Sequence, residues 1–450
     1  MKTEKLKQNV KGYVHQFEDG GLRLLRKGQK GVIHAIFSRF GLVLILLLLQ
    51  VGLLFSIFRW FGNLWPHYFG GSVVVTSAMV IYLLNSKMDN SAKITWMVVV
   101  AIAPVVGIPM FFYVKSNFGH NILRKRLLEL EDQLRGWLPQ SQTAVAQLKA
   151  LEPGAASLAK YLYGRGGGFP VYQNTAMTYF PGGEAKFEEL LRQLETAEEY
   201  IFVEYFIIDE GLMWGKILEV LARKALQGVD VRVMYDGTCE FSTLPRNYPR
   251  LLEKLNIQCK VFSPVQPFVS THYNYRDHRK ILVIDGRVGF TGGVNLADEY
   301  INHIQKHGRW KDAAVMLEGE AVRSLTAQFL QMWGILKEPE YEQFLTRPIP
   351  VPENAKGVAA PYGDCPLDGE RVGEMVYIDL LNRARDYIHI MTPYLILDGE
   401  LETALKFAAE RGVDVHLILP GKPDKRFPYA LAKSHYSALL DSGVKISEWS

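Results

Sequence analysis

Cysteine is scarce in this sequence of 450 residues, which holds three: Cys239, Cys259 and Cys365. No two of them have the Cys-x-x-Cys spacing, and no cluster of histidine and cysteine has the spacing of zinc ligands. An odd number of isolated thiols is typical of a protein in a reducing compartment, which argues against a disulfide-stapled secreted scaffold. The Gly-x-x-x-x-Gly-Lys-Ser/Thr loop is also missing, which argues against a P-loop nucleotide site.

An excess of charge of one sign is missing too. The formal net charge is +4, charged residues make up 22% and hydrophobic residues 48%. This composition can bury a core and is not that of a disordered chain, and the length predicts roughly two to three structural units. The C-terminal part has no pronounced basic stripe, so a nucleic-acid partner is not expected.

Charged residues are missing altogether from two long apolar stretches, residues 40–58 and residues 94–114. A bilayer core of about 30 Å requires roughly 20 apolar residues of helix. We therefore predict transmembrane helices over residues 40–60 and 94–114. A third is predicted over residues 70–86, for which a re-entrant or interfacial segment is the alternative. Together they make residues 1–120 an N-terminal membrane region.

Basic residues flank this region on both sides, so the positive-inside tendency conflicts with an odd number of spans. The unpaired thiols and the lack of any Asn-x-Ser/Thr sequon favour a cytoplasmic C-terminal portion, and we predict a multi-pass protein of the cell membrane. Residues 121–165 are predicted to form a connector. Its leucines at 123, 127, 130 and 134 have helical spacing, and this helix either lies on an anionic membrane surface or packs on the following domain.

The C-terminal part contains an internal repeat. Residues 197–211 resemble residues 384–399, and each stretch is followed by a helix-like segment and then Gly-Val-Asp-Val, at an offset of 184 residues from Gly228 to Gly412. Each copy reads strand, helix, strand, which is the pattern of βαβ units with a parallel sheet. We predict an α/β fold of two pseudo-equivalent halves, residues 166–345 and 346–450.

The first half carries the run Asp-His-Arg-Lys-Ile-Leu-Val-Ile-Asp-Gly, followed by Gly-Gly-Val-Asn. Alternate side chains of a strand share a face, so His278 and Lys280 are expected to point the same way and Arg279 the opposite way. Asp285 and the next glycine predict a tight hairpin turn. An imidazole that attacks phosphorus beside an ammonium that stabilises the non-bridging oxygens indicates phosphodiester chemistry. Gly293 allows close backbone approach.

These residues, His278-x-Lys280-x4-Asp285 with Gly293 and Asn295, resemble the HKD motif of the phospholipase D superfamily, here within residues 272–299. The tandem membrane segments are similar to those of bacterial cardiolipin synthases, as are Lys93-Ile94-Thr95-Trp96, Trp310-Lys311-Asp312 and Thr392-Pro393-Tyr394. The resemblance implies a duplicated phospholipase D-like α/β sandwich preceded by N-terminal transmembrane helices. It also implies transfer of a phosphatidyl group between two phosphatidylglycerol molecules, giving cardiolipin and glycerol through a phosphohistidine.

The same resemblance implies roles for the site residues. His278 is the nucleophile or the acid/base partner, Lys280 is catalytic and Asp285 supports the site as a third catalytic residue. Asn295 and Gly293 hold the substrate phosphate. The carboxylate that orients His278 is left open among Glu204, Asp298 and Glu299. Neither a cofactor nor a metal is implied, and the partners are phosphatidylglycerol, other anionic phospholipids and the membrane, with a homo-oligomer left open.

The second half departs from the family pattern. By the offset, its own His-x-Lys is expected near position 462, beyond Ser450, so residues 346–450 are predicted to be an incomplete half without the second motif. Two other functions stay open. One is a phospholipase D or another phosphatidyl transferase, and the other is a catalytically silent, membrane-bound, lipid-binding partner. The missing motif favours the silent partner, whereas the intact first motif favours an enzyme.

Overall fold

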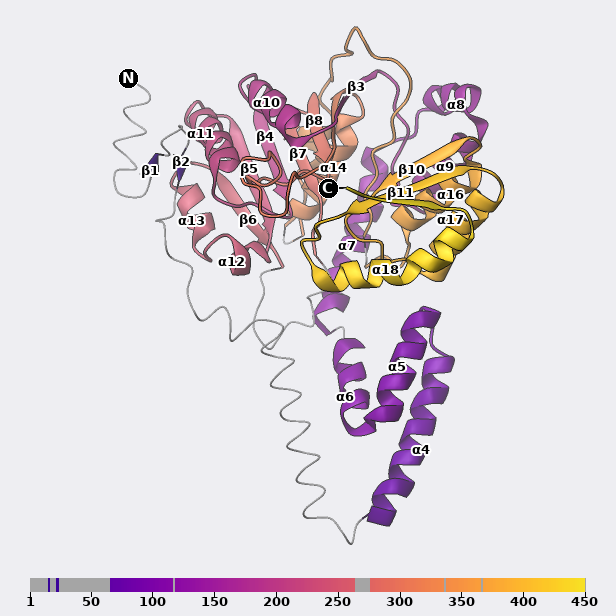
Figure 1. Cartoon of the computed structure of the whole chain (residues 1–450). Coiled ribbons are helices and arrows are strands. Elements are labelled where there is room, and N and C mark those ends of the chain that lie inside the picture. The colour runs from indigo at the N-terminus through magenta and orange to yellow at the C-terminus, as the bar shows by residue number, and fades with distance from the viewer. Residues whose placement is uncertain are drawn as a thin grey trace. The chain divides into compact units, whose positions relative to one another are not determined.

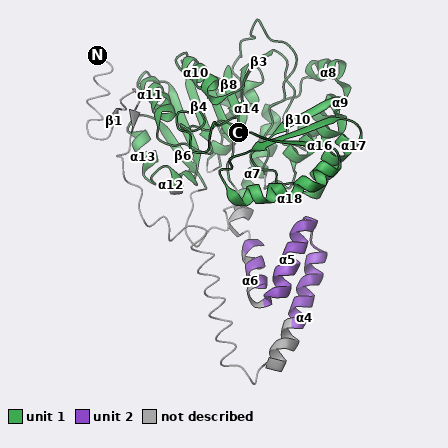
Figure 2. Ribbon diagram, viewed as in Figure 1, with its two compact units in different colours: residues 1–26, 122–265, 275–450 green, residues 27–121, 266–274 purple. Residues whose placement is uncertain are grey.

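The computed structural model describes residues 15–16, 22–23, 65–115, 118–263, 276–335, 337–365 and 367–449. The chain forms two compact units (Figure 2). One is helical and comprises residues 27–121 and 266–274, and the other is an α/β unit of residues 1–26, 122–265 and 275–450.

The helical unit is formed by α4 (Trp65–Leu84), α5 (Asn90–Ile102) and α6 (Pro104–Lys115). Asp89 is the N-cap of α5, and its carboxylate accepts hydrogen bonds from the backbone amides of Ser91 and Ala92. The three helices pack around a small core of Met79, Leu83, Val100 and Phe111.

The three predicted membrane spans agree to different extents with the helices of this unit. The span over 94–114 is wrong as one continuous helix, because α5 ends at Ile102 and Pro104 opens α6. Proline lacks the amide hydrogen and its ring collides with the preceding turn, so a new helix begins there. α4 covers most of the predicted segment 70–86, and the predicted span 40–60 lies outside the described residues. None of the helices described is both long enough and apolar enough to cross a membrane.

The α/β unit is built on a seven-stranded sheet with the order β3-β9-β8-β7-β4-β5-β6 (Figure 1). β4, β5 and β6 are parallel, while β7 pairs antiparallel with β4 and continues through β8 and β9 to β3. The strands are β3 (Thr175–Phe180), β4 (Tyr200–Tyr205), β5 (Asp230–Asp236), β6 (Gln258–Phe262), β7 (Lys280–Ile284), β8 (Val288–Gly292) and β9 (Ala314–Gly319). A separate antiparallel pair is formed by β1 (His15–Gln16) and β2 (Leu22–Arg23).

Helices cover both faces of this sheet. The helices are α10 (Gly183–Leu194), α11 (Leu212–Leu226), α12 (Cys239–Ser242), α13 (Tyr248–Glu253), α14 (Val322–Trp333) and α15 (Tyr341–Leu345). Alternate residues of β4 enter two different cores, because successive side chains of a strand point to opposite faces. Val203 lies in a core with α10 and α11, and Phe202 lies in the other core, stacked on Phe329 of α14 at 4.4 Å between ring centroids.

The connector is helical and packs on the domain. It comprises α7 (Phe118–Trp137), α8 (Gln142–Leu151) and α9 (Pro153–Gly164). Leu127 and Leu134 of α7 are buried in the same core as Phe329, and Nε of Arg124 donates to the carbonyl of Leu367 at 2.8 Å. Of the two predicted surroundings for this amphipathic helix, the structure has the packed one.

A second sheet contains three parallel strands in the order β10-β11-β12. Its elements are α16 (Val372–Arg383), β10 (Tyr387–Met391), α17 (Gly399–Glu410), β11 (Asp414–Pro420), α18 (Arg426–Asp441) and β12 (Lys445–Trp449). Its register repeats that of the large sheet. Tyr200 pairs with Asp230 as Tyr387 pairs with Asp414, and the next pair of strands also corresponds between the two sheets. The register thus agrees with the repeat seen in the sequence.

The two sheets differ at one edge. In the large sheet β7 pairs with the free side of β4, whereas β10, the counterpart of β4, has no strand on that side among the residues described. The large sheet therefore has the strand that carries the motif, and the small sheet shows the three parallel strands that precede it.

Candidate active site

The pairing of β7 with β4 determines where the motif lies. Lys280, the first residue of β7, pairs with Tyr205, the last residue of β4. The carboxyl ends of β4 and β5 meet at this edge, which is where open α/β sheets bind their ligands. His278 lies just before β7, so the structure brings His278 and Lys280 to the expected end of the sheet.

His278 and Lys280 are in direct contact. Nζ of Lys280 lies 3.2 Å from Nδ1 of His278 and donates to the His278 carbonyl at 2.6 Å. The imidazole packs against the ring of Phe206 at 4.5 Å between centroids. His278 is exposed, whereas Lys280 is 5% exposed. A ligand can therefore reach the imidazole, with the ammonium beneath it.

The two pKa values complement each other. Desolvation and the positive charges of Lys280 and Lys425 lower the pKa of His278 to about 4, against the opposing effect of Asp277. Burial lowers the pKa of Lys280 to about 8, with Asp277 and Asp312 acting in the opposite direction. At neutral pH the imidazole is therefore uncharged and keeps a lone pair for attack, while Lys280 is still mostly an ammonium that can bind a phosphate.

Asp312 belongs to the site, although its only mark in the sequence is a family likeness. It lies two residues before β9, and its Oδ1 accepts a hydrogen bond from the amide of Ala313 at 2.8 Å. Burial raises the pKa of Asp312, while the charges of Lys186 and Lys280 lower it. A Cβ on Gly293 would overlap with the Asp312 carboxylate. Gly293 was expected to let the backbone approach a ligand, and here it also makes room for Asp312.

Asn295 ties together two loops at the site. Its Oδ1 accepts from the amide of Ile207 at 3.1 Å, and its Nδ2 donates to the Tyr300 hydroxyl at 2.8 Å. An amide nitrogen has two hydrogens, so one is left for a phosphate oxygen. Phosphate binding by Asn295 stays a prediction that this geometry allows.

The structure does not bring Asp285 to His278 and Lys280, and its assignment as a catalytic residue stays a prediction. Asp285 lies at the far end of β7, roughly 16 Å along the strand from Lys280. Its carboxylate accepts hydrogen bonds of 2.8–2.9 Å from the backbone amides of residues 198–200, where β4 begins. The expected hairpin turn is confirmed, since Asp285 and Gly286 both have positive φ, at 50° and 66°.

Glu204 is placed on the opposite face of the sheet from Lys280. It is fully buried, and Arg279 lies 3.8 Å from its Oε1. Burial raises the pKa of Glu204 well above its usual value, Asp277 raises it further, and Arg279 opposes them. Arg279 therefore points away from His278, as the alternation predicts, and Glu204 is its partner.

The other two carboxylates proposed to orient His278 are also engaged elsewhere in the described part of the chain. The Asp298 carboxylate accepts from the amides of Leu212 and Met213 at 2.9 and 2.8 Å and so caps α11. Glu299 pairs with Lys306 at 3.3 Å. None of the three candidates has a described contact with a ring nitrogen of His278. The motif alone does not indicate which partners these three carboxylates have in the folded protein.

One acidic group among the described residues has the spacing of metal ligands, formed by Glu374, Asp398 and Glu400. Arg371 already lies 3.1 Å from Glu374 and 3.3 Å from Asp398. The group is therefore partly neutralised by an arginine, and it belongs to the helices of the second sheet rather than to the His278 site.

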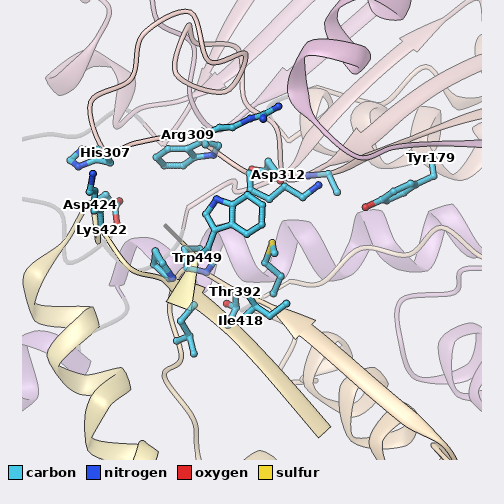
Figure 3. Close-up of a pocket in the computed structure, with 16 residues that line it drawn as sticks. Tyr179, His307, Arg309, Asp312, Thr392, Ile418, Lys422, Asp424 and Trp449 are labelled. Atoms are coloured by element: carbon cyan, nitrogen blue, oxygen red, sulfur yellow. Dashed lines mark hydrogen bonds between the residues drawn. The ribbon is translucent and has the colours of Figure 1, made fainter. Parts of the chain in front are cut away.

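A cavity of about 300 Å³ reaches Asp312 from the side of the second sheet. One wall comes from Tyr179 and the segment 307–313, and the other from the carboxyl ends of β10, β11 and β12. In Figure 3, His307, Lys422 and Asp424 lie together on one side of the cavity, and Tyr179 lies on the opposite side. Both halves thus contribute to one cavity beside the motif.

Comparison with known proteins identifies the family. Residues 190–333 and 377–450 match the family described as cardiolipin synthase, PLD-like domain. The cardiolipin synthase of Geobacillus kaustophilus (strain HTA426) is 33% identical over 382 residues, which cover 84% of this chain and 74% of that protein. The chain belongs to the cardiolipin synthase family of the phospholipase D superfamily.

Family membership extends across both sheets, because the two matched stretches contain β4–β9 and β10–β12. A protein of Streptococcus mutans serotype c (strain ATCC 700610 / UA159), described as uncharacterized, is 55% identical over 371 residues, covering 82% of this chain and 80% of that protein. The crystal structure of phosphatidylserine synthase from Haemophilus influenzae Rd KW20 has a TM-score of 0.43 and 13% identity, covering 63% of this chain and 74% of that one. That likeness is too distant to bear on function.

The charge state of His278 gives the first test. In protein labelled with ¹³C-histidine, the His278 resonance is expected not to titrate between pH 5 and 8. Lys280→Met should raise its pKa by roughly one unit, since a neighbouring cation disfavours the charged imidazole. Lys311→Met, in the cavity wall, is the matched control and should leave it unchanged. A His278 midpoint near 6.5, the value of an unperturbed imidazole, would contradict this site geometry.

Proposed function

We propose that this chain transfers the phosphatidyl group of one phosphatidylglycerol to a second, giving cardiolipin and glycerol. The observation that carries the proposal is a neutral, exposed imidazole at His278 in contact with the ammonium of Lys280, beside a cavity lined by both halves. Membership of the cardiolipin synthase family supports the choice of substrate.

In the first step, His278 attacks the phosphorus of phosphatidylglycerol with a nitrogen lone pair. A nitrogen–phosphorus bond forms, the phosphorus–oxygen bond to the headgroup glycerol breaks, and glycerol leaves with a proton from a general acid. Lys280 stabilises the negative charge on the non-bridging oxygens. A general acid works best with a pKa near the operating pH, so the pKa of about 4 suits His278 as the nucleophile.

In the second step, the hydroxyl of another phosphatidylglycerol loses its proton to the base and attacks the same phosphorus. The nitrogen–phosphorus bond breaks, cardiolipin leaves, and His278 regains its lone pair. The ammonium of Lys280 has three hydrogens, and its contacts with Nδ1 and the carbonyl of His278 leave one for a phosphate oxygen.

The general acid and base is assigned to a second half. The shared register of the two sheets supports reading residues 346–450 as part of a half like the first. A strand placed beside β10 as β7 is beside β4 would bring a second His-x-Lys to the carboxyl ends of β10 and β11. Those ends line the cavity, so the second imidazole would lie on the wall opposite the segment that contains Asp312.

The cavity is assigned to the headgroup of a lipid substrate. Its rim has Arg309 and Lys422, whose charges attract an anionic phosphate, and its wall includes Trp449 and Ile418. A volume of about 300 Å³ is at the lower end of small-molecule sites and fits a headgroup rather than acyl chains.

The helical unit is assigned to the membrane. Its surface exposes large apolar side chains that a water-soluble bundle would normally bury, and patches of this kind mark membrane or protein contacts. They are Val73, Val74, Val75, Ile81, Leu84, Ile94, Val98, Ile102, Met110, Phe112 and Val114. This exposure supports contact of the helical unit with the membrane. The proposal further takes the protein as multi-pass in the cell membrane, with a cytoplasmic catalytic part and an anionic phospholipid substrate.

The reaction is tested with the full chain in vesicles of labelled phosphatidylglycerol, without any nucleotide-activated lipid. We expect cardiolipin and glycerol in a 1:1 ratio, and His278→Ala should lower the rate by about 10³-fold or more. His416→Ala, which removes a histidine that has no lysine two residues on, is the matched control. Cardiolipin formed at an unchanged rate by His278→Ala would refute the proposal.

The same assay separates the alternative functions. Phosphatidic acid in place of cardiolipin would identify a phospholipase D, and a phosphatidyl alcohol formed only with an added alcohol would identify another transferase. Binding of phosphatidylglycerol without turnover would identify a silent lipid-binding partner.

The membrane assignment is tested by partition. The purified chain should co-sediment with phosphatidylglycerol vesicles and resist extraction at high salt, since apolar burial is insensitive to screening. Replacing Val74, Val98 and Ile102 together by serine should increase extraction. Extraction of the unaltered chain by salt alone would contradict insertion of the helical unit.

A further inference from the structure

Lys186 is a lysine on α10 whose side chain is fully buried. A buried ammonium is costly unless its hydrogens are bonded and its charge is balanced, so such residues are rare without a reason. Nζ of Lys186 donates to the Tyr205 hydroxyl and to the Val294 carbonyl, both at 3.0 Å, and lies 4.9 Å from the centre of the Tyr205 ring.

Both partners of Lys186 belong to the site. Val294 lies between Gly293 and Asn295, in the turn that the motif assigns to phosphate. Tyr205 is the residue of β4 that pairs with Lys280. Lys186 therefore joins the phosphate turn to the strand that aligns the motif, on the same face of the sheet as Lys280.

Lys186 is coupled electrostatically to Asp312. Burial lowers the pKa of Lys186 to about 7 and that of Lys280 to about 8, and the negative charge of Asp312 opposes both shifts. Both lysines in turn lower the pKa of Asp312. One carboxylate thus interacts with two buried lysines, of which Lys186 is only partly protonated at neutral pH. If Lys186 were uncharged, Asp312 would be balanced by Lys280 alone, which would draw that ammonium away from a phosphate.

We propose that Lys186 is a positioning residue of the phosphate site, which anchors the Val294 carbonyl and neutralises Asp312 so that Lys280 stays available to the substrate. The phosphate chemistry is that of the proposed function, on which the inference rests for its substrate. The arrangement of the three charged groups is a property of the fold. The contribution of Lys186 is through Val294 and Asp312, since it has no exposed surface for a ligand to touch.

The test is binding of inorganic phosphate to the full-length protein, measured by calorimetry alongside turnover of phosphatidylglycerol. Lys186→Met should weaken phosphate binding about tenfold, the size expected within one charge network. It should also raise KM more than it lowers kcat. Lys224→Met is the matched control, because Lys224 is also buried and donates to two backbone carbonyls, those of Glu195 and Ala197 at 2.6 and 2.8 Å, before the start of β4. It should leave phosphate binding unchanged.

A second variant separates charge balance from packing. Adding Asp312→Asn to Lys186→Met should restore at least half of the lost binding free energy, because the unbalanced carboxylate is removed. If Lys186→Met does not fold, as judged by near-ultraviolet circular dichroism, Lys186→Gln carries the same comparison with Asp312→Asn.

Three results would overturn the inference: phosphate affinity that Lys186→Met leaves unchanged, an equal loss in Lys224→Met, or no recovery on adding Asp312→Asn. Failure of the proposed function would look different. Wild-type protein would then bind phosphate, respond to Lys186→Met and make no cardiolipin, which would leave the positioning role of Lys186 supported.

Discussion

The antiparallel pairing of β7 with β4 is the constraint on which the site depends. It places Lys280 beside Tyr205 at the carboxyl ends of the parallel strands and, at the other end of the same strand, places Asp285 against three backbone amides where β4 begins. His278 and Lys280 thus lie at the site end of the strand, while Asp285 lies at its other end and holds the strand in register. A slip of one residue would turn Lys280 to the face of the sheet on which Glu204 lies.

The second constraint is the balance of charge among the buried groups beside His278. Desolvation and nearby cations lower the pKa of His278, and both Lys186 and Lys280 lower the pKa of Asp312. Gly293 permits this because any side chain there would overlap with Asp312. A buried charge that has lost its partner is strongly unfavourable, so these residues act as one group rather than as independent contacts. In the proposed reaction, a phosphodiester would meet an uncharged imidazole at His278 and the ammonium of Lys280 already in place.

Much of the fold and part of the site could be predicted from local sequence patterns. The alternation of side chains along a strand predicted that His278 and Lys280 point one way and Arg279 the other. The 184-residue offset predicted two sheets with matching register. The predictions that failed, and the residues that were missed, concern contacts between side chains that are distant from the motif in sequence. The carboxylate of Asp298 was considered for His278, but it caps α11, and neither Lys186 nor Asp312 lies near the motif in sequence. The break at Pro104 has a local cause, because proline lacks the amide hydrogen that a continuous helix over residues 94–114 would need there.

The central claim is that His278 forms the covalent bond to phosphorus, and trapping that bond tests it most directly. Full-length protein mixed with phosphatidylglycerol is quenched within one turnover under alkaline conditions, digested and analysed by mass spectrometry. The account predicts a phosphatidyl adduct on the peptide that contains His278, which is absent from His278→Asn. An adduct on another histidine, or cardiolipin formation by a chain that never carries an adduct at His278, would contradict it.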